Sequence, residues 1–185
     1  DLSLEDGVGI HYEARWLGNP LPERDAGSEQ IFLLAADAAR EGWRIFLLGA
    51  APGVAEETAA ILCAAYPGLR IAGTYAGSPA PEQNEAIVER INRSRADLLF
   101  VAYGVPQEEK WIDRNRSRLE TVRVAIGVGG AFDFVAGRTV RAPEWVQRVG
   151  LEWAHRLLRQ PWRWRRMLAL PHFTLRVLRT RRREP

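Results

Sequence analysis

The chain has 185 residues, of which 46% are hydrophobic, and a formal net charge of +3, which suits one packed domain with an appendage. Its single cysteine, Cys63, excludes a disulfide framework and a thiolate metal cluster, which fits a reducing cytoplasm. No uninterrupted apolar run approaches the roughly 18 to 20 residues needed to span a bilayer. Cys63 lies in a helical apolar pattern, so we expect a small buried side chain.

The charge is divided unevenly along the chain. Residues 1–137 carry 13 Lys and Arg against 20 Asp and Glu, a net charge of −7, whereas residues 138–185 carry 13 Arg against 3 Glu, a net charge of +10. The basic part is also rich in Trp and Leu, which is typical of a segment that meets nucleic acid or lies on an anionic membrane surface. A packed helical cap on the body or on another subunit is the plainer alternative.

The first predicted elements are a short strand over Leu2–Leu4 and a helix ending near Trp16. Asp6 follows the strand, where its carboxylate either points into a ligand crevice or N-caps the helix. Arg24 lies in the next loop. Its planar guanidinium pairs either with a phosphate or with neighbouring surface carboxylates.

A helix from Ser28 through Arg40 and a strand over 43–48 come next. The strand runs into a loop with Gly49 and Gly53 that opens another helix. These glycines let the backbone approach a phosphate near the positive end of that helix. Their spacing matches neither the dinucleotide fingerprint nor a P-loop.

A further strand is predicted over 69–77, followed by a helix over 82–95. Tyr75 and Gly77 lie at the end of this strand. The Tyr75 ring either stacks on a base or only packs against its neighbours.

The most regular stretch runs from Asp97 to Asp133 and predicts a strand, a helix and a second strand. Its two runs, Leu98–Ala102 and Val122–Val128, are apolar along nearly their whole length, which favours a parallel sheet covered by helices on both faces. Ligands bind such sheets outside the carboxyl ends of the strands. Glycines and polar residues follow both runs at that edge: Gly104, Gln107, Glu108, Glu109, Gly129, Gly130 and Asp133.

The remaining residues predict an amphipathic helix that Pro143 opens and that Pro161 separates from a second amphipathic segment. We therefore expect an α/β domain over 1–140 and a basic helical appendage over 141–185.

Most familiar catalytic arrangements are missing from the sequence. The three histidines stand apart, and no DxD pair is present to hold a divalent metal. The remaining candidates suit a metal-free site in which a carboxylate removes a proton and cationic side chains absorb the charge of a leaving diphosphate.

Several segments together resemble the WecG/TagA/CpsF glycosyltransferases, in the same order over nearly all of residues 1–178. They are EDGVGI, LPER, FLLGAAPGVAEE, GTYAG, GVPQEEKWIDRNR, GVGGAFDFVAGRTVRAPEW and GLEWAHRLLRQPWRWRR. The resemblance implies a Rossmann-like fold and a metal-independent inverting transferase at the cytoplasmic face of a bacterial membrane. Its donor would be a UDP-linked N-acetylmannosamine or its uronic acid, and its acceptor a polyprenyl-diphosphate-linked amino sugar used in teichoic acid or exopolysaccharide synthesis.

The resemblance also implies roles for individual residues. Asp6 would be the general base, Arg24 would lie near the diphosphate or acceptor, and Glu108 is a further catalytic candidate. Arginines of the appendage would complete the site and help it lie on the membrane surface; these are Arg156, Arg163 and Arg166. The glycine-ended strands would form the uridine and phosphate pocket, with substrate-binding residues Gly49, Tyr75, Gly77, Gly104, Gln107, Gly129, Gly130 and Asp133.

Two departures from the family pattern stand out. The family's turn G-x-P-x-Q-E has glutamine at the position of Glu108, and family members carry an earlier β-α-β portion, so we expect that the N-terminal part of a longer protein is missing. The alternative function is a non-catalytic nucleotide- or nucleic-acid-binding α/β protein. The helical spacing of apolar residues in the tail speaks against a nucleic-acid partner and leaves self-association open.

Overall fold

The computed structural model describes residues 27–139 together with residues 143, 146 and 157. Gly27–Val140 forms a compact unit. Its helices are α2 (Gly27–Glu41), α3 (Val54–Ala65), α4 (Asn84–Ser94), α5 (Gln107–Asn115) and α6 (Ala131–Val135), with short 3₁₀ turns η1 (Pro81–Gln83) and η2 (Arg116–Arg118). Its strands are β1 (Arg44–Gly49), β2 (Arg70–Tyr75), β3 (Leu98–Ala102) and β4 (Val124–Gly127).

The strands form a four-stranded parallel sheet in the order β2-β1-β3-β4. The predicted α/β class with a parallel sheet is confirmed. Strand order reverses at β1, because β2 lies on one side of it and β3 on the other. The carboxyl ends of β1 and β3 therefore flank the switch point at which such sheets bind ligands.

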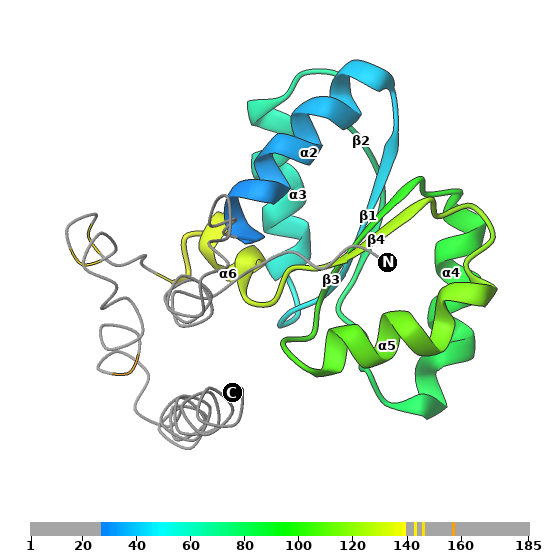
Figure 1. Cartoon of the computed structure of the whole chain (residues 1–185). Coiled ribbons are helices and arrows are strands. Elements are labelled where there is room, and N and C mark those ends of the chain that lie inside the picture. The colour runs from blue at the N-terminus through cyan, green and yellow to red at the C-terminus, as the bar shows by residue number, and fades with distance from the viewer. Residues whose placement is uncertain (1–26, 140–142, 144–145, 147–156, 158–185) are drawn as a thin grey trace, which may run out of the picture. The chain divides into compact units, whose positions relative to one another are not determined.

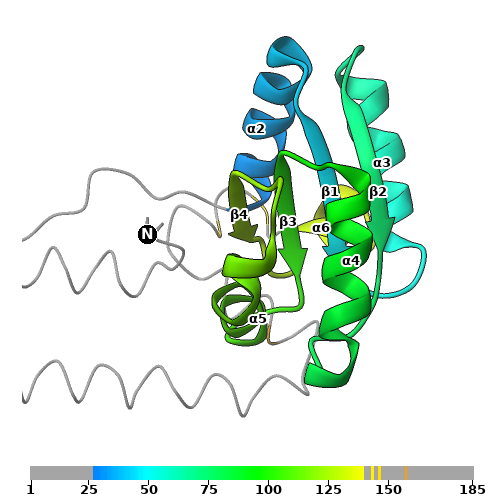
Figure 2. The same cartoon turned by 90° about the vertical axis from the view of Figure 1, so that its right-hand side faces the viewer.

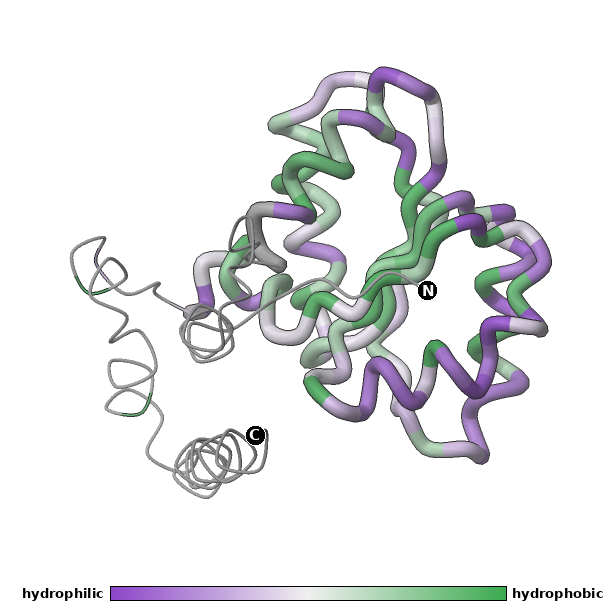
Figure 3. Tube along the Cα trace, in the orientation of Figure 1, coloured by the Kyte–Doolittle hydropathy of each residue, from purple (hydrophilic) through white to green (hydrophobic). Residues whose placement is uncertain are grey.

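Helices cover both faces of the sheet (Figure 1), with α2, α3 and α6 on one face and α4 and α5 on the other. The alternation of side chains along β1 explains the two cores. Ile45 and Leu47 pack with the first group of helices, whereas Phe46 and Leu48 pack with the second. Apolar residues accordingly follow the strands, and polar residues follow the outer surfaces of the helices (Figure 3).

The two apolar runs of the central unit differ in burial. Every residue of β3 is buried, as predicted for a strand covered on both faces. The second run was predicted over Val122–Val128, but β4 is shorter, and Val124 is 44% exposed. The prediction of full burial is wrong for β4 because it pairs only with β3 among the described strands (Figure 2).

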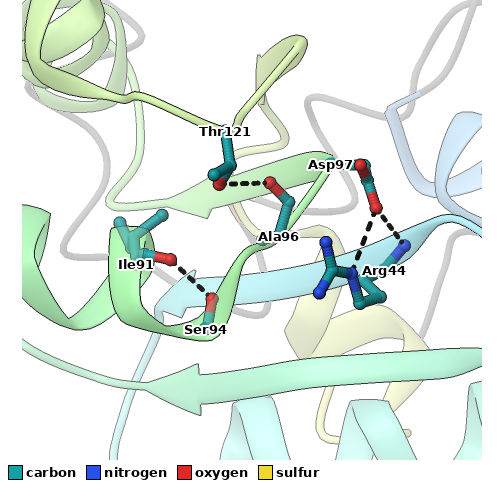
Figure 4. Close-up of polar contacts among 6 residues, drawn as sticks. All are labelled: Arg44, Ile91, Ser94, Ala96, Asp97 and Thr121. Atoms are coloured by element: carbon teal, nitrogen blue, oxygen red, sulfur yellow. Dashed lines mark hydrogen bonds and ion pairs between the residues drawn. The ribbon is translucent and has the colours of Figure 1, made fainter.

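The amino ends of the strands are joined by polar contacts (Figure 4). The Asp97 carboxylate accepts hydrogen bonds from the backbone N–H of Arg44 at 2.9 Å and from its Nε at 3.4 Å. The Thr121 hydroxyl donates to the carbonyl of Ala96 at 2.9 Å. These contacts lie at the edge opposite the candidate site, so they hold the sheet without entering it.

The prediction for Cys63 is wrong, since its side chain is exposed. The core-facing positions of α3 include Ala59 and Leu62, and Cys63 follows one residue later on the outer side of the helix.

Candidate active site

The carboxyl ends of the strands bring together the turns that the sequence singled out. In Figure 2 the arrowheads of β1 to β4 point to one edge of the sheet. The strand ends, turns and first helical turns at this edge contain the predicted residues Gly49, Tyr75, Gly77, Gly104, Gln107, Glu108, Gly129, Gly130 and Asp133. Residues as far apart in the sequence as Gly49 and Asp133 therefore share one edge, as a parallel sheet requires.

Gly49 lies where β1 passes closest to the end of β3. Its φ is +102°, and a Cβ there would lie 2.8 Å from the backbone carbonyl carbon and oxygen of Ala102. The next amide, of Ala50, donates to the Ala102 carbonyl at 2.9 Å. Glycine is needed at this position for backbone approach alone, whether or not a ligand binds.

Glu108 connects two of the turns. It lies in the first turn of α5, is 2% exposed, and its Oε2 accepts hydrogen bonds from the backbone N–H groups of Gly104 and Gly129, each at 2.9 Å. A Cβ on Gly127 would lie 2.9 Å from the Glu108 Cγ. The glycine that ends β4 thus makes room for this side chain.

Gln107 and Asp133, two further predicted residues at this edge, differ in their exposure. Gln107 begins α5 and is exposed, so its amide is accessible at the edge of the sheet. Asp133 lies in the first turn of α6, which Gly130 caps, and its side chain is half-buried. Its backbone carbonyl accepts from the amides of Arg138 and Thr139 at 2.9 and 3.1 Å.

Two tyrosines lie together at the ends of β2 and β3. The Arg90 guanidinium carbon stands 4.5 Å from the centroid of the Tyr75 ring, so one face of that ring already carries a cation. A Cβ on Gly77 would lie 2.9 Å from both the Tyr75 ring and the Tyr103 hydroxyl. Burial raises the pKa of Tyr103 well above its usual value, and Tyr75 adds to the shift.

The Tyr103 hydroxyl has no hydrogen-bond partner in the described part of the chain, although it is buried. Its ring meets the buried Trp111 edge-on, with centroids 6.3 Å apart. Sequence reasoning missed Tyr103 because it follows an apolar strand and is part of no charged motif. The signal available was its place one residue before Gly104, at the strand end.

Arg138 is a second residue that the sequence reasoning did not place at this edge. Its guanidinium forms a two-point ion pair with Glu57 of α3, with Nε–Oε2 and Nη2–Oε1 distances of 3.0 and 2.6 Å. The hydrogen bond from Arg138 holds the pKa of Glu57 below its ordinary value. The pair ties the segment after α6 to the first turn of α3.

The family model for the glycosyl transferase WecG/TagA/CpsF family matches residues 1–185. The chain belongs to the WecG/TagA/CpsF family. It is accordingly a glycosyltransferase, as the sequence motifs predicted.

Two curated relatives of the family carry the same name, N-acetylglucosaminyldiphosphoundecaprenol N-acetyl-beta-D-mannosaminyltransferase. The relative from Bacillus subtilis (strain 168) is 38% identical over 176 residues, which is 95% of this chain and 68% of the relative. The relative from Bacillus spizizenii (strain ATCC 23059 / NRRL B-14472 / W23) is 38% identical over 182 residues, 98% of this chain and 70% of the relative.

Some residues that the family resemblance singles out lie outside the described residues. They are Asp6, Arg24, Arg156, Arg163 and Arg166. Their roles stay predictions, as do those of the predicted residues at the carboxyl edge. The predicted appendage over 141–185 also lies outside, apart from positions 143, 146 and 157.

Two features are absent from the described residues. No group of three or more His, Cys, Asp or Glu side chains there is arranged to hold a metal ion. Among the same residues, no helix combines the length and the apolar character needed to cross a membrane.

Proposed function

We propose that the chain transfers N-acetylmannosamine, or its uronic acid, from UDP onto a polyprenyl-diphosphate-linked amino sugar, with inversion at the anomeric carbon. The observation that carries this proposal is the 38% identity, over 95% of the chain, to a transferase whose name states both the sugar and the lipid-linked acceptor. Family membership favours this reading over the nucleic-acid-binding alternative.

The proposed reaction is a single in-line displacement. Asp6 takes the proton of the acceptor hydroxyl, whose oxygen forms a bond to the anomeric carbon while the bond from that carbon to the diphosphate oxygen breaks. The electron pair leaves with UDP. When the donor sugar is α-linked, inversion gives a β-linkage, which agrees with the beta-D-mannosaminyl part of the relatives' name.

The described residues would serve the donor. Tyr75, Gly77 and Asp133 would bind the uridine, and the backbone amides of the glycine turns would face the phosphates, since such amides are favourable partners for anions. Arg24, Arg156, Arg163 and Arg166 would absorb the charge of the leaving diphosphate in place of a metal.

The basic appendage would bring the enzyme to its acceptor. Arginines that meet lipid phosphates and Trp and Leu side chains that enter the interface would hold it on the cytoplasmic face of the membrane. Self-association through the same apolar residues stays a prediction, to be checked by gel filtration with and without detergent.

To test the proposal, the chain is incubated with a short-chain lipid-diphosphate-N-acetylglucosamine acceptor and either UDP-N-acetylmannosamine or UDP-N-acetylglucosamine. EDTA is present in one set of reactions and absent from a second. We expect a disaccharide product, identified by mass, from the first donor only, and a β-linkage by NMR. Product formed only without EDTA, or an α-linkage, would overturn the metal-free inverting part of the proposal.

A further inference from the structure

We propose that Glu108 is a positioning residue that fixes the two glycine turns at the carboxyl ends of β3 and β4, and that it does not itself transfer a proton. The effect on donor binding rests on the proposed function. The contacts that carry the inference are independent of it.

The first observation is the pair of bonds that the side chain makes. One oxygen of Glu108 accepts from Gly104, four residues earlier, and from Gly129, 21 residues later, both at 2.9 Å. The two donors belong to different turns, each directly after a strand. The backbone bond from the Val128 amide to the Val101 carbonyl, at 2.9 Å, precedes the second turn, and the Glu108 side chain then joins the two turns directly.

The second observation is the space built around the side chain. Gly127 ends β4, and a Cβ there would meet the Glu108 Cγ, Cδ and Oε1 at 2.9, 3.1 and 3.3 Å. A Cβ on Gly129 would lie 3.7 Å from Oε1. Glycine at the end of β4 lets the carboxylate reach across to the second turn, so the backbone and the side chain fit each other.

The third observation separates this role from acid–base chemistry. A general base must come within hydrogen-bond reach of the substrate proton. Glu108 is 2% exposed, and its Oε2 is already shared by two backbone amides. The two hydrogen bonds are partly buried, and leaving such amides without an acceptor costs free energy, so the bonds hold the side chain where it is.

The chemistry of the contact predicts which substitution is tolerated. Both bonds require an acceptor oxygen at the end of a three-carbon side chain. Glutamine supplies an oxygen at the same reach, whereas alanine leaves both amides without an acceptor. Glu108→Gln should therefore behave as the wild type, and Glu108→Ala should not. Glu85→Gln, which removes an exposed carboxylate from the first turn of α4, is the matched control for loss of charge.

The direct experiment is amide hydrogen exchange followed by NMR in the full chain. We expect slow exchange at the Gly104 and Gly129 amides in the wild type, Glu108→Gln and Glu85→Gln. In Glu108→Ala both amides should exchange about tenfold faster or more, with the amides inside β3 unchanged. Equal exchange of both glycine amides in all four proteins would overturn the proposal.

The functional readout is UDP affinity by calorimetry together with kcat, donor KM and the pH profile. Glu108→Ala should raise the dissociation constant for UDP and the donor KM about tenfold while the limbs of the pH profile stay in place. Glu108→Gln should stay within about twofold of the wild type. A Glu108→Gln enzyme as impaired as Glu108→Ala, or one that loses the acidic limb of the profile, would show that the carboxylate takes part in the chemistry.

Two further outcomes are decisive as well. If Glu108→Ala does not unfold cooperatively, Glu108→Asp takes its place: its carboxylate is one carbon shorter, so faster exchange at the two glycine amides and weaker UDP binding are again expected, and wild-type values of both would overturn the proposal. If the wild type binds UDP but does not turn over, the proposed function fails, while exchange and UDP affinity still test Glu108.

Discussion

Asp97 binds the backbone and the side chain of Arg44 at once, although 53 residues separate them. Its carboxylate oxygen lies 2.9 Å from the Arg44 amide nitrogen and 3.4 Å from Nε (Figure 4). Asp97 precedes β3 and Arg44 begins β1, so this contact joins the amino ends of the two central strands. The backbone hydrogen bond from Arg44 is the main reason that the pKa of Asp97 is lowered, against an opposing effect of burial.

A lowered pKa makes the stability of the domain depend on pH. Because the folded pKa of Asp97 lies below the unfolded value, its stabilisation is complete above the unfolded pKa, near 4, and is lost as the pH falls through the folded pKa. We expect Asp97→Asn to lower the free energy of unfolding by about 1 to 2 kcal/mol at pH 7, measured by urea denaturation.

The same difference should shrink below about pH 4, where the wild-type carboxylate takes up its proton. Asp113→Asn is the control, since its ion pair with Arg116 is exposed and long, at 3.6 Å. It should change stability by less than about 0.5 kcal/mol. A difference for Asp97→Asn that is independent of pH would show that its charge does not matter.

Gly73 in β2 lies against the ring of Phe46, and a Cβ there would be 2.7 Å from Phe46 Cε2. Phe46 is 1% exposed, so the ring has little room to move. We expect Gly73→Ala to cost about 1 to 3 kcal/mol of unfolding free energy through overpacking.

A double variant separates overpacking from other effects of the Gly73 substitution. Combining Gly73→Ala with Phe46→Leu should cost less than the sum of the two single substitutions. The smaller side chain at position 46 leaves room for the added methyl group, and the methyl group fills part of the space that the ring vacates. Strictly additive costs would contradict the steric explanation.

Tyr75 offers a test of the nucleotide pocket. If uracil stacks on the ring face opposite Arg90, Tyr75→Ala should weaken UDP binding by about 1 to 3 kcal/mol, which is roughly 5- to 150-fold, by calorimetry. Tyr75→Phe keeps the ring and should bind UDP as the wild type does. Unchanged UDP affinity in Tyr75→Ala would mean that Tyr75 only packs against Arg90 and Gly77.

The fold could be predicted from the sequence where local pattern and long-range packing agree. The apolar run of β3 was predicted with its observed bounds. All five of its residues are buried, so the run of apolar residues begins and ends where the strand does. The strand predicted over Val122–Val128 was too long, because the valines at its two ends lie outside β4, which spans Val124–Gly127. Before β4, the amide of Arg123 donates to the carbonyl of Asp97, outside the regular ladder.

The candidate site could be predicted only in outline. Glycines after each strand placed the turns at one edge, because parallel strands end together. The sequence could not show that Glu108 reaches Gly129, that Arg138 pairs with Glu57, or that Arg90 covers Tyr75. Each of these contacts joins two elements whose distance depends on the packed structure, so no local pattern encodes it.

The most direct test of the proposed reaction measures UDP release from UDP-N-acetylmannosamine with and without the lipid-diphosphate acceptor, in the wild type and in Asp6→Asn. Asp37→Asn is the control, because the Asp37 side chain on α2 is 44% exposed and forms an ion pair with Arg40. We predict acceptor-dependent release that Asp6→Asn abolishes and Asp37→Asn retains. Acceptor-dependent release that persists in Asp6→Asn would contradict Asp6 as the base, and no release by a wild type that binds UDP would contradict the transferase proposal for this chain.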